Sequence, residues 1–402
     1  MRHRALAVNV GLAVTSVAVA GIGTELALRA LLPPTTGYYV LIPNTDRTFH
    51  PQPAVTPGVE GPARYRVNQH GIRGREFGPD DREYRILAVG GSTTECAYLD
   101  EDEVWTALLE RALGRTSDGR PVWVGNVGRS ARTARDHVVQ LKYLLPGYPR
   151  IDAAVVLVGV NDLISALADG AEYRRPAPIA DSAAEQAQVR RAFVFVPGAI
   201  HHPGTDVLAS AEAPWYKATA LWQLAKRARM AHLARTNPRR QDARGTWLDD
   251  WRAARARGET VDALPPSFED ALAEYRATLL AMAAVTRAAG VRLILVTQPS
   301  LWRPDNSAEE LRRLWMGGIG DSRSAPPARY YSSRVLRLAM DGYNRQLMAV
   351  CDGGEDIICL DGASAVAPDT TMMYDDVHFT EAGARRLAAY LSDELQRRSP
   401  FR

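Results

Sequence analysis

Residues 84–92 of this 402-residue chain read YRILAVGGS. The run from Tyr84 to Val89 is short and mostly apolar, which predicts a buried β-strand, and the two glycines predict a sharp turn at its end. Ser92 follows that turn directly. In parallel α/β sheets, ligands bind outside the carboxyl ends of the strands. The stretch therefore predicts the first strand of an α/β domain, with Ser92 as a candidate nucleophile.

The chain after Ser92 alternates between helical and extended patterns. Helical periodicity is found at residues 104–113, 132–145, 268–289, 334–350 and 381–398. Further apolar runs typical of strands cover residues 122–126, 153–158, 291–296 and 357–360. Strands that alternate with helices predict a doubly wound parallel sheet. We therefore expect an α/β fold of three layers, α/β/α, around a parallel sheet of about five strands.

Polar side chains follow the expected strands at the points where they end. Ser92 follows the first strand, Asn161 follows the third, and Asp375 and His378 lie between the fifth strand and the last helix. The carboxyl ends of parallel strands share one edge of the sheet, so these residues are expected to meet there.

These residue types supply the groups that acyl transfer needs. Asp375 stands three residues before His378, and a turn can bring its carboxylate to the imidazole and orient the ring as a general base. Ser92 is then the nucleophile. Candidate donors for an oxyanion hole are the Ser92 N–H, the Asn161 side-chain amide and a backbone N–H at Ala131.

Alternatives to these assignments remain at single positions. Gly128 is the alternative to Ala131 as the third oxyanion donor. Asp162, beside Asn161, is expected to be a helix N-cap, and His137 is expected to lie on a helix surface.

In this order, four blocks of sequence resemble the SGNH/GDSL hydrolase superfamily. The blocks are GGSTT at 90–94, NVGRSA at 126–131, GVND at 159–162 and DDVH at 375–378. The similarity covers roughly residues 84–165 and 270–398, and residues 68–74 resemble the segment that precedes this domain in membrane-anchored bacterial members. The resemblance implies a flavodoxin-like fold and ester hydrolysis or acyl transfer with no metal and no cofactor.

The sequence departs from the family pattern at two positions. Gly91 stands where the GDSL signature has aspartate, a substitution that many members share, and Ser92 is retained. Ala131 stands where the second block often has a glycine of the oxyanion hole. Alanine keeps the backbone N–H but resists a positive φ, which glycine adopts freely.

The N-terminus predicts attachment to a membrane. Arg2 and Arg4 precede residues 5–23, which carry no charge and would form a helix about 28 Å long, roughly the thickness of a bilayer core. Basic residues before the span favour a cytoplasmic N-terminus and an extracytoplasmic catalytic domain, in the periplasm or at the cell surface. Two alternatives are a signal peptide cleaved near residues 18–20, which would give a secreted protein, and a buried helix of a soluble protein.

The pattern along the chain divides it into segments. We expect an anchor and stub at 1–36, a lead-in at 37–83 and a hydrolase domain at 84–398 that contains a mostly helical insertion at 165–267. The insertion is rich in arginine and carries four tryptophans, Trp215, Trp222, Trp247 and Trp251. We expect a solvated arginine-rich face with the tryptophans packed inward. A substrate cap and a membrane-facing surface are the alternatives.

Composition excludes some classes of partner. A formal net charge of +3 gives no argument for nucleic acid. The three cysteines form no C-x-x-C pair, so we expect no metal site built on them. Cys351 and Cys359 could pair in an oxidising compartment, and the oligomeric state is left open.

These observations predict a serine esterase that hydrolyses an O-acyl ester on a cell-envelope glycan or lipid. Two alternatives are an O-acyltransferase that uses the same three residues on a surface polysaccharide, and a non-catalytic binding module on the same fold.

Overall fold

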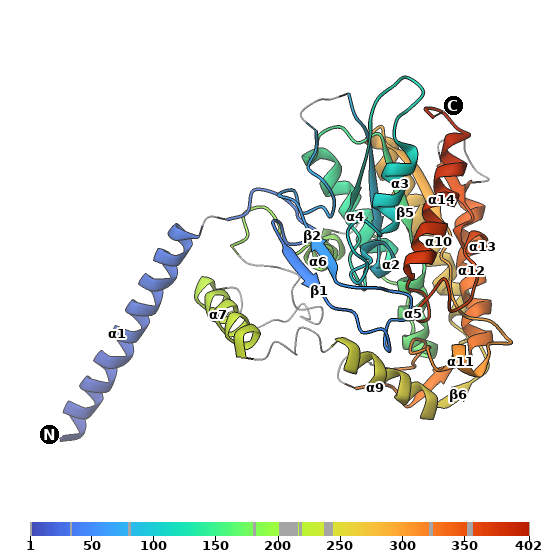
Figure 1. Cartoon of the computed structure of the whole chain (residues 1–402). Coiled ribbons are helices and arrows are strands. Elements are labelled where there is room, and N and C mark those ends of the chain that lie inside the picture. Colours follow the sequence, from blue (N-terminus) through green and yellow to red (C-terminus); the bar gives the residue numbers. More distant parts are fainter. Residues whose placement is uncertain are drawn as a thin grey trace.

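The computed structural model describes the chain apart from residues 1, 33, 79–81, 180–181, 201–215, 217–218, 237–243, 321–324, 352–356 and 402. One long helix, α1 (Arg2–Leu31), extends away from a large α/β body (Figure 1).

The body is built on a sheet of five parallel strands. The strands are β3 (Tyr84–Gly90), β4 (Val122–Asn126), β5 (Ala153–Leu157), β7 (Arg292–Val296) and β9 (Ile357–Leu360). Their spatial order is β4-β3-β5-β7-β9, which becomes 2-1-3-4-5 when the strands are numbered along the chain. This is the flavodoxin-like order, so the predicted fold class is confirmed. All residues of β3, β4 and β5 are buried, as expected of strands covered on both faces.

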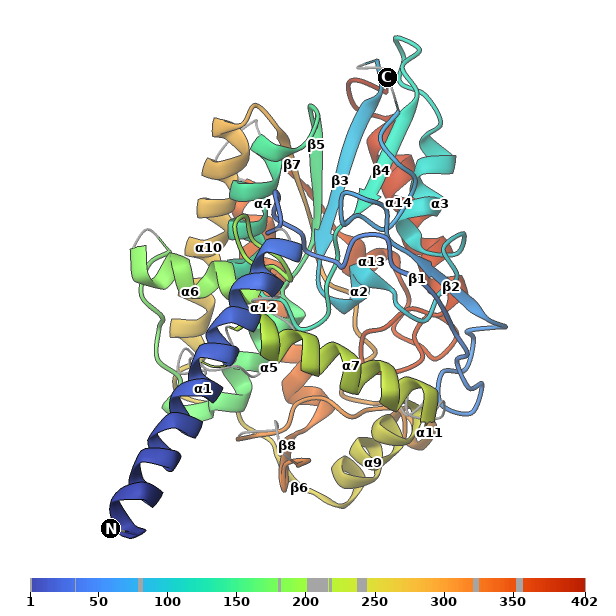
Figure 2. The same ribbon diagram turned by 90° about the vertical axis from the view of Figure 1, so that its left-hand side faces the viewer.

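Helices cover both faces of the sheet and complete the three layers. On one face α3 (Trp105–Leu113) packs against α14 (Glu381–Gln396). On the other face α10 (Phe268–Ala288) packs against α4 (Ala134–Leu144) and α12 (Ser333–Cys351). Figure 2 shows the sheet between these two groups.

Short helical segments lie in the loops, and some of them directly follow the carboxyl ends of strands. They are α2 (Ser92–Glu95), η1 (Leu145–Gly147), α5 (Val160–Asp169), η2 (Gly170–Glu172), α11 (Ala308–Leu311) and α13 (Gly362–Ala365). Of these, α2 and α5 start directly after β3 and β5, so Ser92 and Asn161 both stand in the first turn of a helix.

The lead-in is fastened by a buried arginine to the edge of the sheet where the strands end. Its two strands, β1 (Asp46–Phe49) and β2 (Ala63–Arg66), pair antiparallel. Arg73 follows them, and its guanidinium donates to the carbonyl oxygens of Cys96 and Leu99 at 2.8 and 2.7 Å. A buried guanidinium needs such acceptors, so this contact fixes the chain just after α2.

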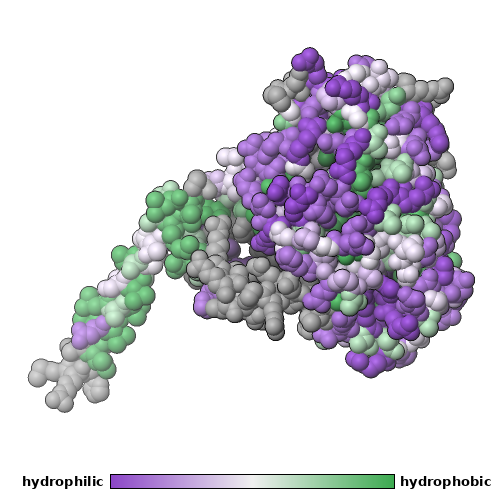
Figure 3. Space-filling view, in the orientation of Figure 1, coloured by the Kyte–Doolittle hydropathy of each residue, from purple (hydrophilic) through white to green (hydrophobic). Residues whose placement is uncertain are grey.

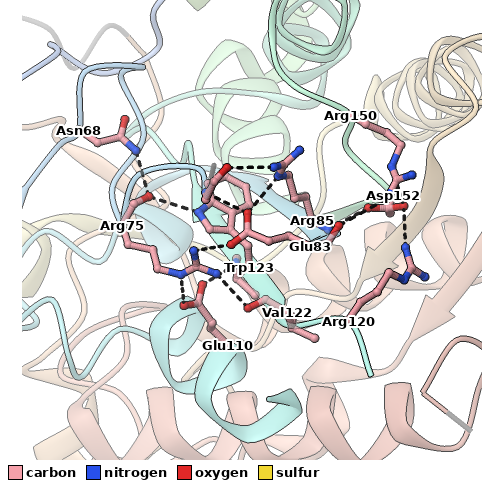
Figure 4. A network of polar contacts seen from close by, with 12 residues as sticks. Asn68, Arg75, Glu83, Arg85, Glu110, Arg120, Val122, Trp123, Arg150 and Asp152 are labelled. Carbon is pink, nitrogen blue, oxygen red and sulfur yellow. Dashed lines mark hydrogen bonds and ion pairs between the residues drawn. The ribbon is translucent and has the colours of Figure 1, made fainter. Parts of the chain in front are cut away.

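A network of ion pairs ties the lead-in to the opposite edge of the sheet, where the strands begin (Figure 4). Arg75 bonds Glu83 at 2.6 Å and Glu110 at 2.8 Å, and Glu83 also accepts from the buried Arg85 at 3.1 Å. The side chains of Glu83 and Arg85 are almost fully buried, so removing one of them would leave the charge of the other without a partner. The network therefore stabilises the attachment of the lead-in.

The insertion is mostly helical, as predicted. It contains α6 (Ser182–Ala192), α7 (Ala220–Thr236) and α9 (Arg244–Arg257). The short strand β6 (Glu259–Val261) closes it and pairs in parallel with β8 (Arg329–Tyr331).

The tryptophans of the insertion are not all packed inward, so that expectation is wrong in part. Trp222 is 40% exposed and Trp247 is 46% exposed, while Trp251 is half-buried against Trp315. Trp215 lies outside the described residues. Trp222 lies on α7, which packs beside α1, and α9 contacts the body through only one of its faces, so a tryptophan count does not reveal which rings are covered.

The N-terminal helix is longer than predicted and fully outside the core. A segment of 24 residues, Val8–Leu31, is long and apolar enough to cross a membrane, with a mean hydropathy of 1.6 and none of it buried. Figure 3 shows its apolar surface. The alternative of a buried soluble helix is therefore wrong. A membrane anchor and a signal sequence would both look like this.

Helix α1 touches the insertion near its end. The two carboxylate oxygens of Glu25 accept the backbone N–H groups of Ala220 and Leu221 at 2.9 and 3.1 Å. Glu25 thus caps the start of α7, whose first N–H groups have no partner within the helix.

The cysteine pair that the sequence left open is bonded. Cys351 and Cys359 form a disulfide between the end of α12 and β9. Cys96 is a buried free thiol, and burial raises its pKa to about 12, so it stays neutral.

Candidate active site

Three predicted residues meet at the carboxyl edge of the sheet in one hydrogen-bonded line. Ser92 Oγ lies 2.7 Å from His378 Nε2. His378 Nδ1 lies 2.7 Å from Asp375 Oδ2 and 2.8 Å from Asp375 Oδ1. Ser92 starts α2, and the other two residues lie in the loop that leads into α14. A hydroxyl, an imidazole and a carboxylate in this order are the arrangement found in serine hydrolases.

The D-x-x-H spacing is explained by a local turn. Asp375 Oδ1 accepts the backbone N–H groups of Val377 and His378 at 3.1 and 2.9 Å. Aspartate commonly stabilises turns in this way. The turn places the carboxylate beside the imidazole of His378 and fixes which ring nitrogen faces it. The side chain of Asp375 is 2% exposed and that of His378 15%.

The two titratable groups shift each other's pKa in opposite directions. Burial alone would raise the pKa of Asp375, but the positive charge on His378 and the hydrogen bonds from His378 and Trp315 lower it overall. Burial alone would lower the pKa of His378, but the negative charge of Asp375 raises it above its usual value. The pair therefore favours the state in which Asp375 is ionised and a proton on the imidazole is stabilised.

Asn161 lies beside the turn that carries Ser92. Its Nδ2 donates to the carbonyl oxygen of Arg132 at 2.8 Å. A side-chain amide has two N–H groups, so the second remains for another acceptor. A Cβ placed on Gly91 would come within 2.3 Å of Asn161 Nδ2. The amide is thus held directly against the residue before Ser92.

Ala131 adopts the conformation that glycine would adopt. Its φ is +60°, in the left-handed region, although its methyl group was expected to resist this. Such a conformation costs a non-glycine residue of order 1–2 kcal/mol and persists where the surrounding structure imposes it. Among the described residues, no hydrogen-bond acceptor is paired with the Ala131 N–H.

The backbone N–H of Gly128, the alternative to Ala131, is already engaged. The Gly128 N–H already donates to Asn126 Oδ1 at 2.8 Å. A Cβ at Gly128 would lie 2.3 Å from the backbone nitrogen of Glu95, so this glycine is needed for close approach of the loop to α2.

Glu95 and Asn126 hold the site together, and neither role was predicted from the sequence. Glu95 Oε2 accepts the N–H and the hydroxyl of Ser130 at 2.8 and 2.5 Å. Asn126 Nδ2 donates to the carbonyl oxygen of Thr94 at 2.6 Å. Both bonds tie α2, which carries Ser92, to the loop that carries Ala131. Glu95 stands three residues after Ser92, and that proximity is the signal that could have found it.

Two further expectations need correction. Gly159 is the N-cap of α5, while the Asp162 carboxylate accepts the Ala134 N–H at the start of α4, at 3.0 and 3.1 Å. Burial raises the pKa of Asp162 to about 7. His137 is wrongly placed on a helix surface, because it is fully buried with Nδ1 2.8 Å from Gln140 Oε1. Helix α4 packs against both α6 and α10, so few of its residues face solvent.

A small cavity of about 10 Å³ opens beside Ser92 and His378. Tyr98, Leu99 and Phe379 are among the residues that line it. By this measure it holds about one water molecule or a group of that size. A larger cavity of about 560 Å³ lies elsewhere, between the lead-in and α3, and does not include Ser92 or His378.

Among the described residues, no group of three or more histidine, cysteine, aspartate or glutamate side chains is placed to hold a metal ion.

Comparison with known proteins gives a distant structural likeness. No model of a known family matches the chain, and no curated protein matches it. Solved structures that are similar include the acetylxylan esterase Axe2 from Geobacillus stearothermophilus, with 15% identity and a TM-score of 0.37, covering 77% of this chain and 93% of that one. Another is described as a lipolytic protein of the G-D-S-L family from Desulfitobacterium hafniense DCB-2, with 11% identity and a TM-score of 0.36, covering 77% of this chain and 99% of that one.

Proposed function

We propose that this protein is a serine esterase of the SGNH type, with Ser92 as nucleophile, His378 as general base and acid, and Asp375 as the orienting carboxylate. The observation that carries the proposal is the continuous line of hydrogen bonds from Ser92 Oγ through the imidazole to the Asp375 carboxylate. Ser92 and the Asp375–His378 pair are 286 positions apart at their contact, and a serine, an imidazole and a carboxylate in this order are the constellation that identifies a serine nucleophile with its base.

The proposed reaction has two halves. Ser92 Oγ attacks the ester carbonyl carbon while its proton passes to His378 Nε2, and the carbonyl electron pair moves to the oxygen. The N–H groups of Ser92, Ala131 and the Asn161 amide stabilise that oxyanion. The intermediate collapses, and His378 returns the proton to the departing alcohol. Water then attacks the acyl-serine with the same proton transfers and releases the acid.

The small cavity supports a short acyl group such as acetyl. It has room for about one methyl group, so a long chain would have to displace Leu99 or Phe379, both of which are buried. The larger alcohol part of the ester then extends toward solvent. A cell-envelope glycan or lipid that carries a short acyl ester fits this arrangement, with the acyl group in the cavity and the glycan or lipid outside it.

We propose that α1 anchors the catalytic domain outside the cytoplasm. The exposed apolar segment Val8–Leu31 and the basic residues before it support this, and so does the disulfide, which is typical of oxidising compartments. The full-length protein should stay in the membrane fraction after a carbonate wash. Recovery of the mature domain in the soluble extract would indicate cleavage instead.

Mutation of the nucleophile tests the esterase proposal. The full-length protein in detergent should hydrolyse p-nitrophenyl acetate faster than p-nitrophenyl octanoate, and a fluorophosphonate probe should label Ser92. Ser92→Ala should lose labelling and about 10⁴-fold or more of the activity, because the other groups cannot replace a missing nucleophile. Ser117→Ala changes an exposed serine between α3 and β4, away from the site, and should still be labelled. Equal hydrolysis by Ser92→Ala would refute the assignment.

Activity should fall at acid pH with a midpoint above that of ordinary histidine. His378 must be neutral to accept the proton of Ser92, and the charge of Asp375 raises its pKa above 6.5. A profile of kcat/KM against pH for p-nitrophenyl acetate should therefore give an acid limb above pH 6.5. Asp162→Asn is the control, because Asp162 has a pKa of about 7 but lies outside the proton path. A midpoint at or below 6.5 would contradict the assigned coupling.

A further inference from the structure

The catalytic acid has a hydrogen-bond donor besides those of its own turn. Trp315 Nε1 donates to Asp375 Oδ2 at 3.0 Å, on the oxygen that also faces His378 Nδ1. Trp315 comes from the segment between α11 and β8, about 60 positions earlier in the chain. The contact is therefore tertiary and independent of the D-x-x-H turn.

Trp315 is itself held from two sides. Its backbone N–H donates to Asp376 Oδ2 at 2.7 Å, so the two neighbouring carboxylates, Asp375 and Asp376, bind its side chain and its backbone respectively. Its ring also meets the edges or faces of Trp247 and Trp251, with centroid distances of 5.1 and 6.0 Å. Both of these tryptophans lie on α9 of the insertion.

Arginines of helix α9 also bind backbone carbonyl groups next to both partners of the Trp315–Asp375 hydrogen bond. Arg252 donates to the carbonyl oxygen of Tyr374, the residue before Asp375, at 3.1 Å. Arg255 donates to the carbonyl oxygen of Met316, the residue after Trp315, and to that of Tyr331 at 2.9 Å. One face of α9 therefore contacts both the loop that carries the acid and the segment that carries its donor.

We propose that Trp315 is a positioning residue for the catalytic acid, and that the insertion serves through α9 to hold Trp315 and the Asp375 loop in register. This inference rests on the proposed esterase function. The Asp375 carboxylate is almost fully buried, so it depends on protein donors to stay ionised and in one orientation. The indole N–H donates to Oδ2, one of the two carboxylate oxygens that face His378 Nδ1, and so restrains the carboxylate from rotating away from the ring.

Removing the indole N–H should have two effects. Trp315→Phe keeps an aromatic ring against α9 but loses the donor to Asp375. A hydrogen bond to a charged group is strong enough that its loss should lower kcat/KM by about tenfold or more. The acid limb of the pH profile should also move upward. The positive end of the N–H dipole partly offsets the charge of Asp375, so its loss leaves more negative charge acting on His378, whose pKa rises.

The matched control is Trp123→Phe. Trp123 is fully buried in β4, its Nε1 donates to the carbonyl oxygen of Arg75 at 3.2 Å, and it lies at the far edge of the sheet. This variant should lower Tm and leave the acid limb unchanged. If Trp315→Phe does not fold, β-(3-benzothienyl)alanine at position 315 replaces the N–H with sulfur at nearly constant shape.

The outcomes separate the two proposals. An upward shift of the acid limb in the Trp315 variants, with Trp123→Phe unshifted, supports the positioning role. An unshifted limb, with activity lost only in proportion to Tm, overturns it and leaves the esterase assignment intact. Undiminished activity of Ser92→Ala in the same assay would instead overturn the esterase assignment itself.

Discussion

Asp375→Asn should lower kcat/KM for p-nitrophenyl acetate by about 10⁴-fold while the protein stays folded. The asparagine carbonyl can still accept the N–H groups of Val377 and His378, so the turn is preserved. Its NH₂ group, however, faces His378 Nδ1 and stabilises the tautomer that carries the proton on Nε2. That imidazole cannot accept a proton from Ser92.

The control for this prediction lies in the same loop. Asp369 Oδ1 accepts the N–H groups of Thr371 and Met372 at 2.9 and 3.2 Å, so its carboxylate stabilises a similar turn without touching the imidazole. Asp369→Asn should leave kcat/KM within about threefold of the natural protein, and circular dichroism should show both variants folded. A loss of less than tenfold in Asp375→Asn would show that the carboxylate does not orient the base.

The periodic parts of the fold could be predicted from the sequence because local pattern and packing agree there. The expected strands 122–126 and 357–360 coincide with β4 and β9, because each is a compact, mostly apolar run, fully buried in β4 and partly buried in β9. The expected site residues also follow from topology. The strand ends share an edge, but β5 and β7 lie between β3 and β9, so the loop before α14 must also cross that edge to bring His378 to Ser92.

The parts that failed depend on contacts between distant segments. Nothing near Trp315 in the sequence indicates that its indole reaches Asp375, because the bond forms only when two loops close on each other under α9. The burial of His137 likewise depends on the insertion helix α6, which packs over α4. Helical periodicity alone cannot report a second covering layer.

Contacts from distant segments also override the local backbone preference of Ala131. Alanine disfavours a positive φ by its own sterics. Here Glu95 holds Ser130 from α2, and Asn161 holds the carbonyl oxygen of Arg132 from α5. The residue between these two bonds has its backbone fixed from both sides, so the strain is located where an oxyanion donor is proposed.

Gly91→Ala should reduce kcat/KM by about 10²- to 10³-fold, the typical effect of losing one oxyanion donor. The new methyl group would lie 2.3 Å from Asn161 Nδ2, far inside van der Waals contact, so the amide must move away from the nucleophile turn. The family signature has aspartate at this position. In this chain, any side chain there competes with Asn161 for the same space.

A double-mutant cycle tests whether the loss acts through Asn161. Asn161→Ala alone should lose a similar factor, and adding Gly91→Ala to it should cost little more, because the displaced group is already absent. Gly147→Ala is the control, since a Cβ there meets no atom within 4 Å and its backbone needs no positive φ. Additive losses in the double variant would mean that Gly91 matters for the geometry of Ser92 itself. The glycine would then serve the nucleophile, and the third block of the sequence would need another role.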